Sequence, residues 1–187
     1  MALDDDWIMN LPNILTLIRV LLIPLFVILI INKIFSWALV TFAVAGITDA
    51  VDGLIARLTH QRTELGAYLD PIADKLLLSS AFVTLAIIEL IPSWLTVIVV
   101  TRDVIILIGF LMFFLTNRRP TMAPSLVSKV TTFFQISLVI LFLLSEYYSI
   151  PRLIYNVVMY GVIVFTILSG THYIFLGARI LNEKKNQ

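Results

Sequence analysis

Six long, mainly apolar stretches divide the chain, and this division limits its fold more than any other feature. The stretches are residues 12–31, 36–55, 69–90, 94–115, 130–144 and 153–181. A helix needs about 20 mostly apolar residues to cross the hydrocarbon core of a bilayer. Runs of this length without strand-type alternation favour helices over a barrel. We therefore expect an all-α, polytopic integral membrane protein with six transmembrane helices.

The composition supports a membrane protein built as one domain. Of 187 residues, 60% are hydrophobic and 13% charged, whereas about a quarter of a soluble domain is charged. No polar, Pro-rich or Gly-rich linker interrupts the chain, so we expect a single domain over residues 1–187. It would comprise an interfacial segment (1–11), a six-helix bundle (12–181) and a cytoplasmic tail (182–187). With no cysteine, disulfides and thiol chemistry are excluded, and the net charge of +1 gives no reason to expect a nucleic-acid partner.

Lysine and arginine are unevenly shared between the loops, which predicts the orientation. One side of a six-span bundle would carry eight such residues and the other only Lys33 and Arg152. We expect the richer side, with both termini, in the cytoplasm of a bacterial inner membrane. The start "MALDDDW" is acidic and no cleavage site follows it, so we expect the first apolar segment to be retained.

Four aspartates interrupt the apolar pattern at regular spacing. Asp49 and Asp52 are three residues apart, and Asp70 and Asp74 are four apart, so each pair shares one face of a helix. Because the intervening loop is short, the two helices are expected to be antiparallel neighbours whose acidic faces meet near the cytoplasmic side. The active site is therefore expected there.

These carboxylates need compensating charge. A mid-helix aspartate costs roughly 2.5–3.5 kcal/mol on insertion scales, and Arg57 and Lys75 cannot balance four of them. Hard oxygen ligands select Mg²⁺, Mn²⁺ or Ca²⁺, and a carboxylate cluster facing a phosphate is typical of a two-metal site. Gly53 and Ala56, on the same face as Asp49, would let a bulky ligand approach the helix backbone.

Structural alternatives exist for single members of this set. Asp70 followed by Pro71 can be a helix N-cap, and Asp49 can form an ion pair with Arg57. Gly53 and Ala56 can serve close helix packing. None of these alternatives accounts for all four aspartates together.

The segment from Asp49 to Asp74 reads D-x2-D-G-x2-A-R-x8-G-x3-D-x3-D. This pattern resembles the signature of the CDP-alcohol phosphotransferases at every specified position. "LPNILTLIRVLLIP", at residues 11–24, is similar to the first span of members that make phosphatidylglycerol phosphate or cardiolipin. The resemblance implies a CDP-linked lipid, CDP-diacylglycerol, as donor of a phosphatidyl group and CMP as leaving group. It also suggests a homodimer.

The resemblance also implies roles for individual residues. Two Mg²⁺ or Mn²⁺ ions would be held by all four aspartates, and Asp74 would be the general base on the acceptor hydroxyl. The CDP-lipid pocket would be lined by Asp52, Gly53, Ala56, Arg57 and Gly66.

Polar residues in the first span extend this pocket. Asn13, Thr16 and Arg19 recur every three residues and can share one broad face. Arg19 inside an apolar run needs a carboxylate or a lipid phosphate as partner. We favour the CDP-lipid for all three residues; the alternative is that Arg19 extends to the interface.

Cations further along the chain suit an anionic acceptor: Arg102, Arg118 and Lys129. The alternative is an ion pair of Arg102 with Asp103 or Asp74 beside an ordinary positively charged loop. Two glycerol-type acceptors fit, namely phosphatidylglycerol, giving cardiolipin, and glycerol 3-phosphate. Phosphatidylglycerol phosphate synthases tend to carry a further arginine where Phe110 stands, which favours phosphatidylglycerol.

A different class of function would be ion transport, since intramembrane aspartates also mark ion pathways. That class predicts inverted repeats or broken helices near the midplane. The aspartate motif occurs once in the sequence, so transport is the distant alternative.

Overall fold

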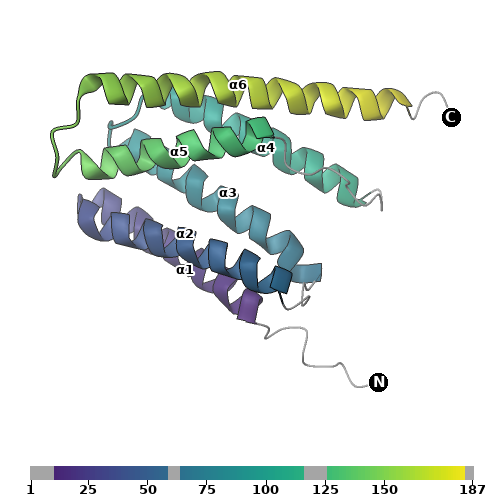
Figure 1. Ribbon diagram of the computed structural model, residues 1–187, viewed down its shortest axis with the longest axis horizontal. Helices are drawn as coiled ribbons and strands as arrows, with labels where there is room; N and C mark the ends of the chain where they lie inside the picture. The colour runs from purple at the N-terminus through teal and green to yellow at the C-terminus, as the bar shows by residue number, and fades with distance from the viewer. Residues whose placement is uncertain (1–10, 59–63, 116–125, 184–187) are drawn as a thin grey trace. The chain divides into compact units, whose positions relative to one another are not determined.

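The computed structural model describes residues 11–58, 64–115 and 126–183, and their side chains over 14–51, 72–109 and 126–175. The described residues form helices and no strand (Figure 1). The helices are α1 (Leu11–Ile31), α2 (Phe35–Leu58), α3 (Glu64–Ile87), α4 (Ser93–Leu115), α5 (Leu126–Leu144) and α6 (Arg152–Glu183). The all-α prediction is confirmed.

Helix ends differ from the predicted ones by a few residues. α2 continues to Leu58, α3 runs from Glu64 to Ile87 rather than over 69–90, and α5 begins at Leu126. The start of α3 was placed too late because its first turn contains the charged Glu64 and the small Gly66, which do not extend an apolar run.

The turn between α1 and α2 shows how one helix ends. Lys33 has a positive φ of 58°. Its N–H donates to the carbonyl oxygen of Ile30, and the N–H of Ile34 donates to that of Leu29, both at 2.9 Å. This is a Schellman motif, which satisfies the last carbonyls of a helix. It lets α2 start four residues after the end of α1.

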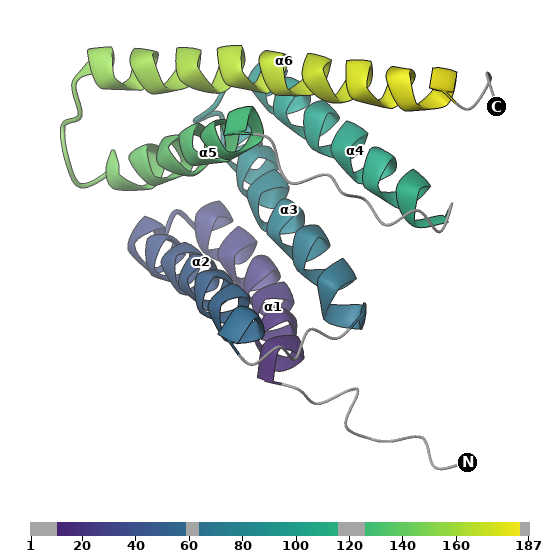
Figure 2. The same ribbon diagram turned by 45° about the vertical axis from the view of Figure 1, so that its right-hand side comes forward.

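The chain forms two compact units, and the first contains α1, α2 and α3. α1 packs against both α2 and α3, and the rings of Phe26 and Phe42 lie 5.5 Å apart between α1 and α2. The start of α1, the end of α2 and the start of α3 lie at one end of this unit (Figure 2). Residues from three separate segments thus come to one end.

The second unit contains α4, α5 and α6, with α6 packed against the other two. The rings of Phe134 and Phe165 stack at 5.2 Å between α5 and α6. α6 has 32 residues and is roughly 48 Å long. It is therefore longer than a bilayer core of about 30 Å.

Three segments of the described chain are long and apolar enough to cross a membrane: Ile14–Ile31, Leu126–Leu144 and Arg152–Phe175. Large apolar side chains such as Leu21 and Val157 are more than half exposed, as expected for surfaces in contact with lipid. The integral membrane character is thus supported, while six spans remain a prediction.

Candidate active site

Three residues singled out in the sequence lie at similar depth in the first unit. Arg19 is eight residues after the start of α1, Asp49 nine before the end of α2, and Asp74 ten after the start of α3. At 1.5 Å per residue, each is roughly 12–15 Å from its helix end. Arg19 and Asp49 are in contact, and Asp74 lies a similar distance along α3, whose start is at the same end of the unit (Figure 2).

Arg19 is fully buried and contacts Asp49. Its Nη1 lies 2.7 Å from Asp49 Oδ1, and the Asp49 side chain is 44% exposed. With the described residues, no guanidinium N–H of Arg19 makes a hydrogen bond of standard geometry, so the contact is an ion pair. The alternative that Arg19 extends to the interface is wrong, because none of its surface is exposed. A carboxylate partner is present.

The other predicted site residues are placed by their backbones or by their exposure. Thr16 is buried on α1, and Asp74 is partly exposed on α3. The side chains of seven predicted site residues lie outside the described part, although their backbones are helical: Asn13, Asp52, Gly53, Ala56, Arg57, Gly66 and Asp70. The N-cap alternative for Asp70 is wrong, because α3 begins six residues earlier, at Glu64.

The donor set fits a hard divalent cation. Asp49 and Asp74 offer carboxylate oxygens, which Mg²⁺ and Mn²⁺ prefer, and both side chains are partly exposed. Asp52 and Asp70 stand on the same two helices, one turn away. No group of three potential metal ligands occurs among the described side chains, which exclude those of Asp52 and Asp70. The meeting of all four carboxylates therefore stays a prediction.

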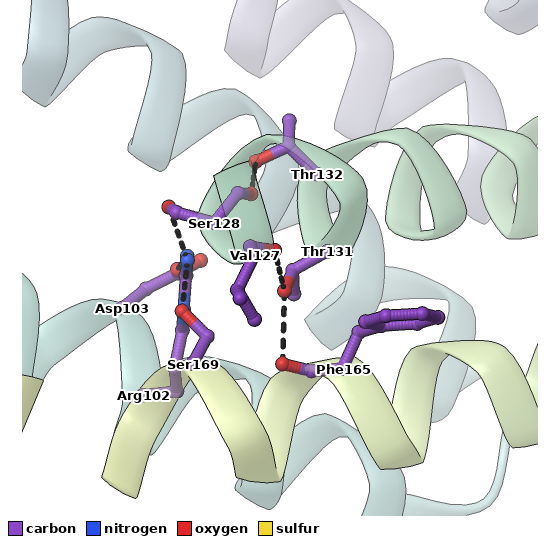
Figure 3. Close-up of polar contacts among 8 residues, drawn as sticks. All are labelled: Arg102, Asp103, Val127, Ser128, Thr131, Thr132, Phe165 and Ser169. Atoms are coloured by element: carbon purple, nitrogen blue, oxygen red, sulfur yellow. Dashed lines mark hydrogen bonds and ion pairs between the residues drawn. The ribbon is translucent and has the colours of Figure 1, made fainter. Parts of the chain in front are cut away.

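A second polar cluster lies in the second unit, around Arg102 (Figure 3). The guanidinium is buried, with Nη1 2.6 Å from Asp103 Oδ1. Nη2 donates to Ser128 Oγ at 2.6 Å and to Ser169 Oγ at 2.8 Å, and Nε donates to Ser169 Oγ at 3.1 Å. Arg102 thereby connects α4, α5 and α6.

The ion pair with Asp103 is one of the alternatives that the sequence left open for Arg102. A guanidinium has five N–H donors, and these contacts use most of them. Of the other predicted acceptor-binding residues, Lys129 is exposed on α5 and Arg118 lies outside the described residues. Sequence reasoning missed Ser128 and Ser169; the only signal was a small hydroxyl residue inside an apolar helix.

Similarity to known proteins indicates the class of reaction. The family model for CDP-alcohol phosphatidyltransferase matches residues 9–168. A probable phosphatidylglycerophosphate synthase of Mycobacterium tuberculosis (strain ATCC 25618 / H37Rv) is 36% identical, over 94% of this chain and 84% of the relative. Human cardiolipin synthase (CMP-forming) is 35% identical, over 90% and 61%. The CDP-diacylglycerol--glycerol-3-phosphate 3-phosphatidyltransferase of Bacillus subtilis (strain 168) is 32% identical, over 88% and 93%.

Proposed function

The chain belongs to the CDP-alcohol phosphatidyltransferase family, and on that premise we propose that it makes cardiolipin. It would transfer the phosphatidyl group of CDP-diacylglycerol to phosphatidylglycerol and release CMP. The observation that carries the proposal is the family's aspartate motif on two helices that, with α1, bring their ends together. A hydroxyl oxygen of the acceptor attacks the phosphatidyl phosphorus, the bond to CMP breaks, and the hydroxyl proton passes to Asp74.

Asp74 acts as the general base in this scheme, since its carboxylate is the last of the motif and is partly exposed. Asp49, Asp52, Asp70 and Asp74 together would hold Mg²⁺ or Mn²⁺, most simply two ions. When bound, such ions neutralise charge on a diphosphate and on a leaving phosphate. The four carboxylates would then keep their positions through ion binding rather than through ion pairs alone.

The CDP-lipid would be held beside the motif. Arg57 would supply N–H donors for a phosphate oxygen. Gly53 and Ala56, as small residues, would let the CDP-lipid approach the helix backbone. Asn13, Thr16 and Gly66 complete the proposed pocket from α1 and α3. The Thr16 hydroxyl is buried on α1 one turn before Arg19, within the same unit.

Two acceptors are compatible with the comparisons, because cardiolipin synthases and phosphatidylglycerophosphate synthases both match the chain. Phe110, where a further cation would suit a small dianion, favours phosphatidylglycerol. Glycerol 3-phosphate is the alternative. Of the two described residues predicted to bind the acceptor, we assign Lys129 to this role, because it is exposed and Arg102 already makes several internal contacts.

Family membership supports a membrane enzyme and gives no support to ion transport. We further propose that both termini and the active site lie on the cytoplasmic side of a bacterial inner membrane, and that the enzyme is a homodimer. The proposed orientation follows from the loop charges, and the dimer from the family resemblance.

The test supplies purified protein with CDP-diacylglycerol and Mn²⁺ or Mg²⁺, and parallel reactions contain phosphatidylglycerol or glycerol 3-phosphate. CMP release and the lipid product are measured together. Cardiolipin formation that stops on addition of EDTA and returns with Mn²⁺ is expected. If product formed only with glycerol 3-phosphate, that compound and not phosphatidylglycerol would be the acceptor. Full activity after exhaustive chelation would contradict the proposed metal dependence.

A further inference from the structure

We propose that Arg19 is a positioning residue for Asp49, so that α1 helps to shape the metal site formed by α2 and α3. The inference rests on the proposed function, because it assumes that Asp49 is a metal ligand. The ion pair itself is a feature of the structure whatever the reaction.

The geometry favours a fixed contact over an incidental one. Nη1 of Arg19 lies 2.7 Å from Oδ1 of Asp49, and Arg19 has no exposed surface. A surface arginine can leave its partner for water, but this one is enclosed between packed helices. Phe26, seven residues later on the same helix, is also fully buried, and its ring lies tilted 5.5 Å from that of Phe42 on α2. Burial and the ion pair with Asp49 together limit the movement of the guanidinium.

Holding one oxygen of a carboxylate sets the plane of the whole group. With Oδ1 of Asp49 held by Arg19, the direction of Oδ2 is also set, and a cation arriving there finds an oriented ligand. Residues that orient metal ligands in this way typically change metal affinity or activity by about 10- to 100-fold when they are replaced. Arg19 would then act on the metal without touching it.

The direction in which Mn²⁺ affinity changes after loss of Arg19 distinguishes a positioning role from a simple charge effect. Removing a positive charge beside a metal ligand should by itself strengthen cation binding, because the local field becomes more negative. Loss of the orientation of Asp49 should instead weaken cation binding. A higher Mn²⁺ requirement after loss of Arg19 therefore indicates positioning.

Three variants test the proposal: Arg19→Gln, Arg19→Lys and the control Phe26→Leu. Phe26→Leu loosens the same α1–α2 interface without touching the carboxylate. The first measurement is the rise in unfolding temperature of the detergent-solubilised protein, without substrate, as Mn²⁺ is titrated. The second is the rate of CMP release against Mn²⁺, followed at saturating Mn²⁺ by the KM for CDP-diacylglycerol.

We expect Arg19→Gln to need about 10- to 100-fold more Mn²⁺ for the same rise in unfolding temperature, with the KM for CDP-diacylglycerol changed less than about twofold. Arg19→Lys, which keeps the charge but not the planar fork, should need a smaller increase. It also serves if Arg19→Gln fails to fold. Phe26→Leu should lower the unfolding temperature and leave the Mn²⁺ requirement unchanged.

Two results would overturn the inference. If Arg19→Gln raised the KM for CDP-diacylglycerol with an unchanged Mn²⁺ requirement, Arg19 would bind the lipid directly. If it behaved like Phe26→Leu, the ion pair would be structural only. Failure of the proposed function looks different, because the unsubstituted protein would then show neither Mn²⁺ stabilisation nor CMP release.

Discussion

Asp74 is the residue on which the proposed proton transfer depends. Asp74→Asn keeps the size of the side chain but cannot accept the proton, and positioned bases contribute about 10²- to 10⁴-fold. We expect CMP release to fall by at least about 100-fold. Glu89→Gln makes the same change at an exposed carboxylate in the turn before α4 and should leave the rate unchanged. Full turnover by Asp74→Asn in a folded protein would remove Asp74 from the role of base.

Ser169 is the second residue whose contacts allow a sharp prediction. Its hydroxyl oxygen accepts hydrogen bonds from Nε and Nη2 of the buried Arg102. Ser169→Ala leaves those donors without this acceptor, which should lower the free energy of unfolding by about 1–3 kcal/mol.

The matched control for Ser169 is Thr171→Ala on the same helix. The Thr171 hydroxyl is exposed and donates to carbonyls of its own helix, those of Ile167 and Leu168. Its loss should change the free energy of unfolding by less than about 0.5 kcal/mol. Equal thermal stability of the two variants in detergent would contradict the role given to Ser169.

The relative positions of two residues were predictable from the sequence where both residues lie on one helix. The spacing of Asp49 and Asp52 is visible in the letters, because helical periodicity converts it into a shared face. For Arg19 the sequence favoured the CDP-lipid and did not identify Asp49, because Asp49 lies 30 residues away and helix rotation decides which side chains meet. Ser169, 67 residues from Arg102, gave no local signal.

At the scale of whole helices, one glycine allows a close approach between α5 and α6. A Cβ on Gly161 would lie 2.4 Å from Cε1 and 2.5 Å from Cδ1 of Phe134, whose ring also stacks on Phe165. Gly161→Ala must therefore displace a packed ring. We expect it to lower the free energy of unfolding by about 1–3 kcal/mol.

Gly109→Ala on α4 is the control for this steric argument. A Cβ on Gly109 meets nothing within 4 Å, so this change should stabilise the helix by up to about 1 kcal/mol through its propensity alone. Thermal unfolding of both variants in one detergent compares them directly. Similar stability of both variants would contradict the close packing of Phe134 on Gly161.

Helices were predictable because long apolar runs specify them, and their ends were less predictable because charged and small residues also join a helix. α3 shows this clearly, since its first turn begins at Glu64 and lies outside the apolar run. The packing order could not be read from the sequence. In the described residues, α2 and α3 both pack mainly on α1, whereas the short loop predicted that they would contact each other.

At the scale of the whole molecule, the number of spans is the main expectation still to be tested. α2, α3 and α4 have 24, 24 and 23 residues, roughly 35 Å each, which is enough to cross a bilayer core of about 30 Å. The described side chains of α2 include the apolar segment Phe35–Val51. Helix length is therefore compatible with the predicted six spans.

Six spans require that the turns before α2, α4 and α6 share one side of the membrane, opposite both termini. The chain has no cysteine, so single cysteines report position without background. Asn32→Cys, Ser93→Cys and Ser149→Cys place one at each turn, all at exposed positions, and a cysteine added after Gln187 marks the other side.

An impermeant maleimide applied to intact cells should label the three turns, and label the added cysteine only after the cells are permeabilised. The cysteine-free protein should stay unlabelled throughout. Protection of Ser93→Cys with labelling of Asn32→Cys would mean that α2 and α3 do not both cross, and the aspartates would then need another explanation than an intramembrane metal site.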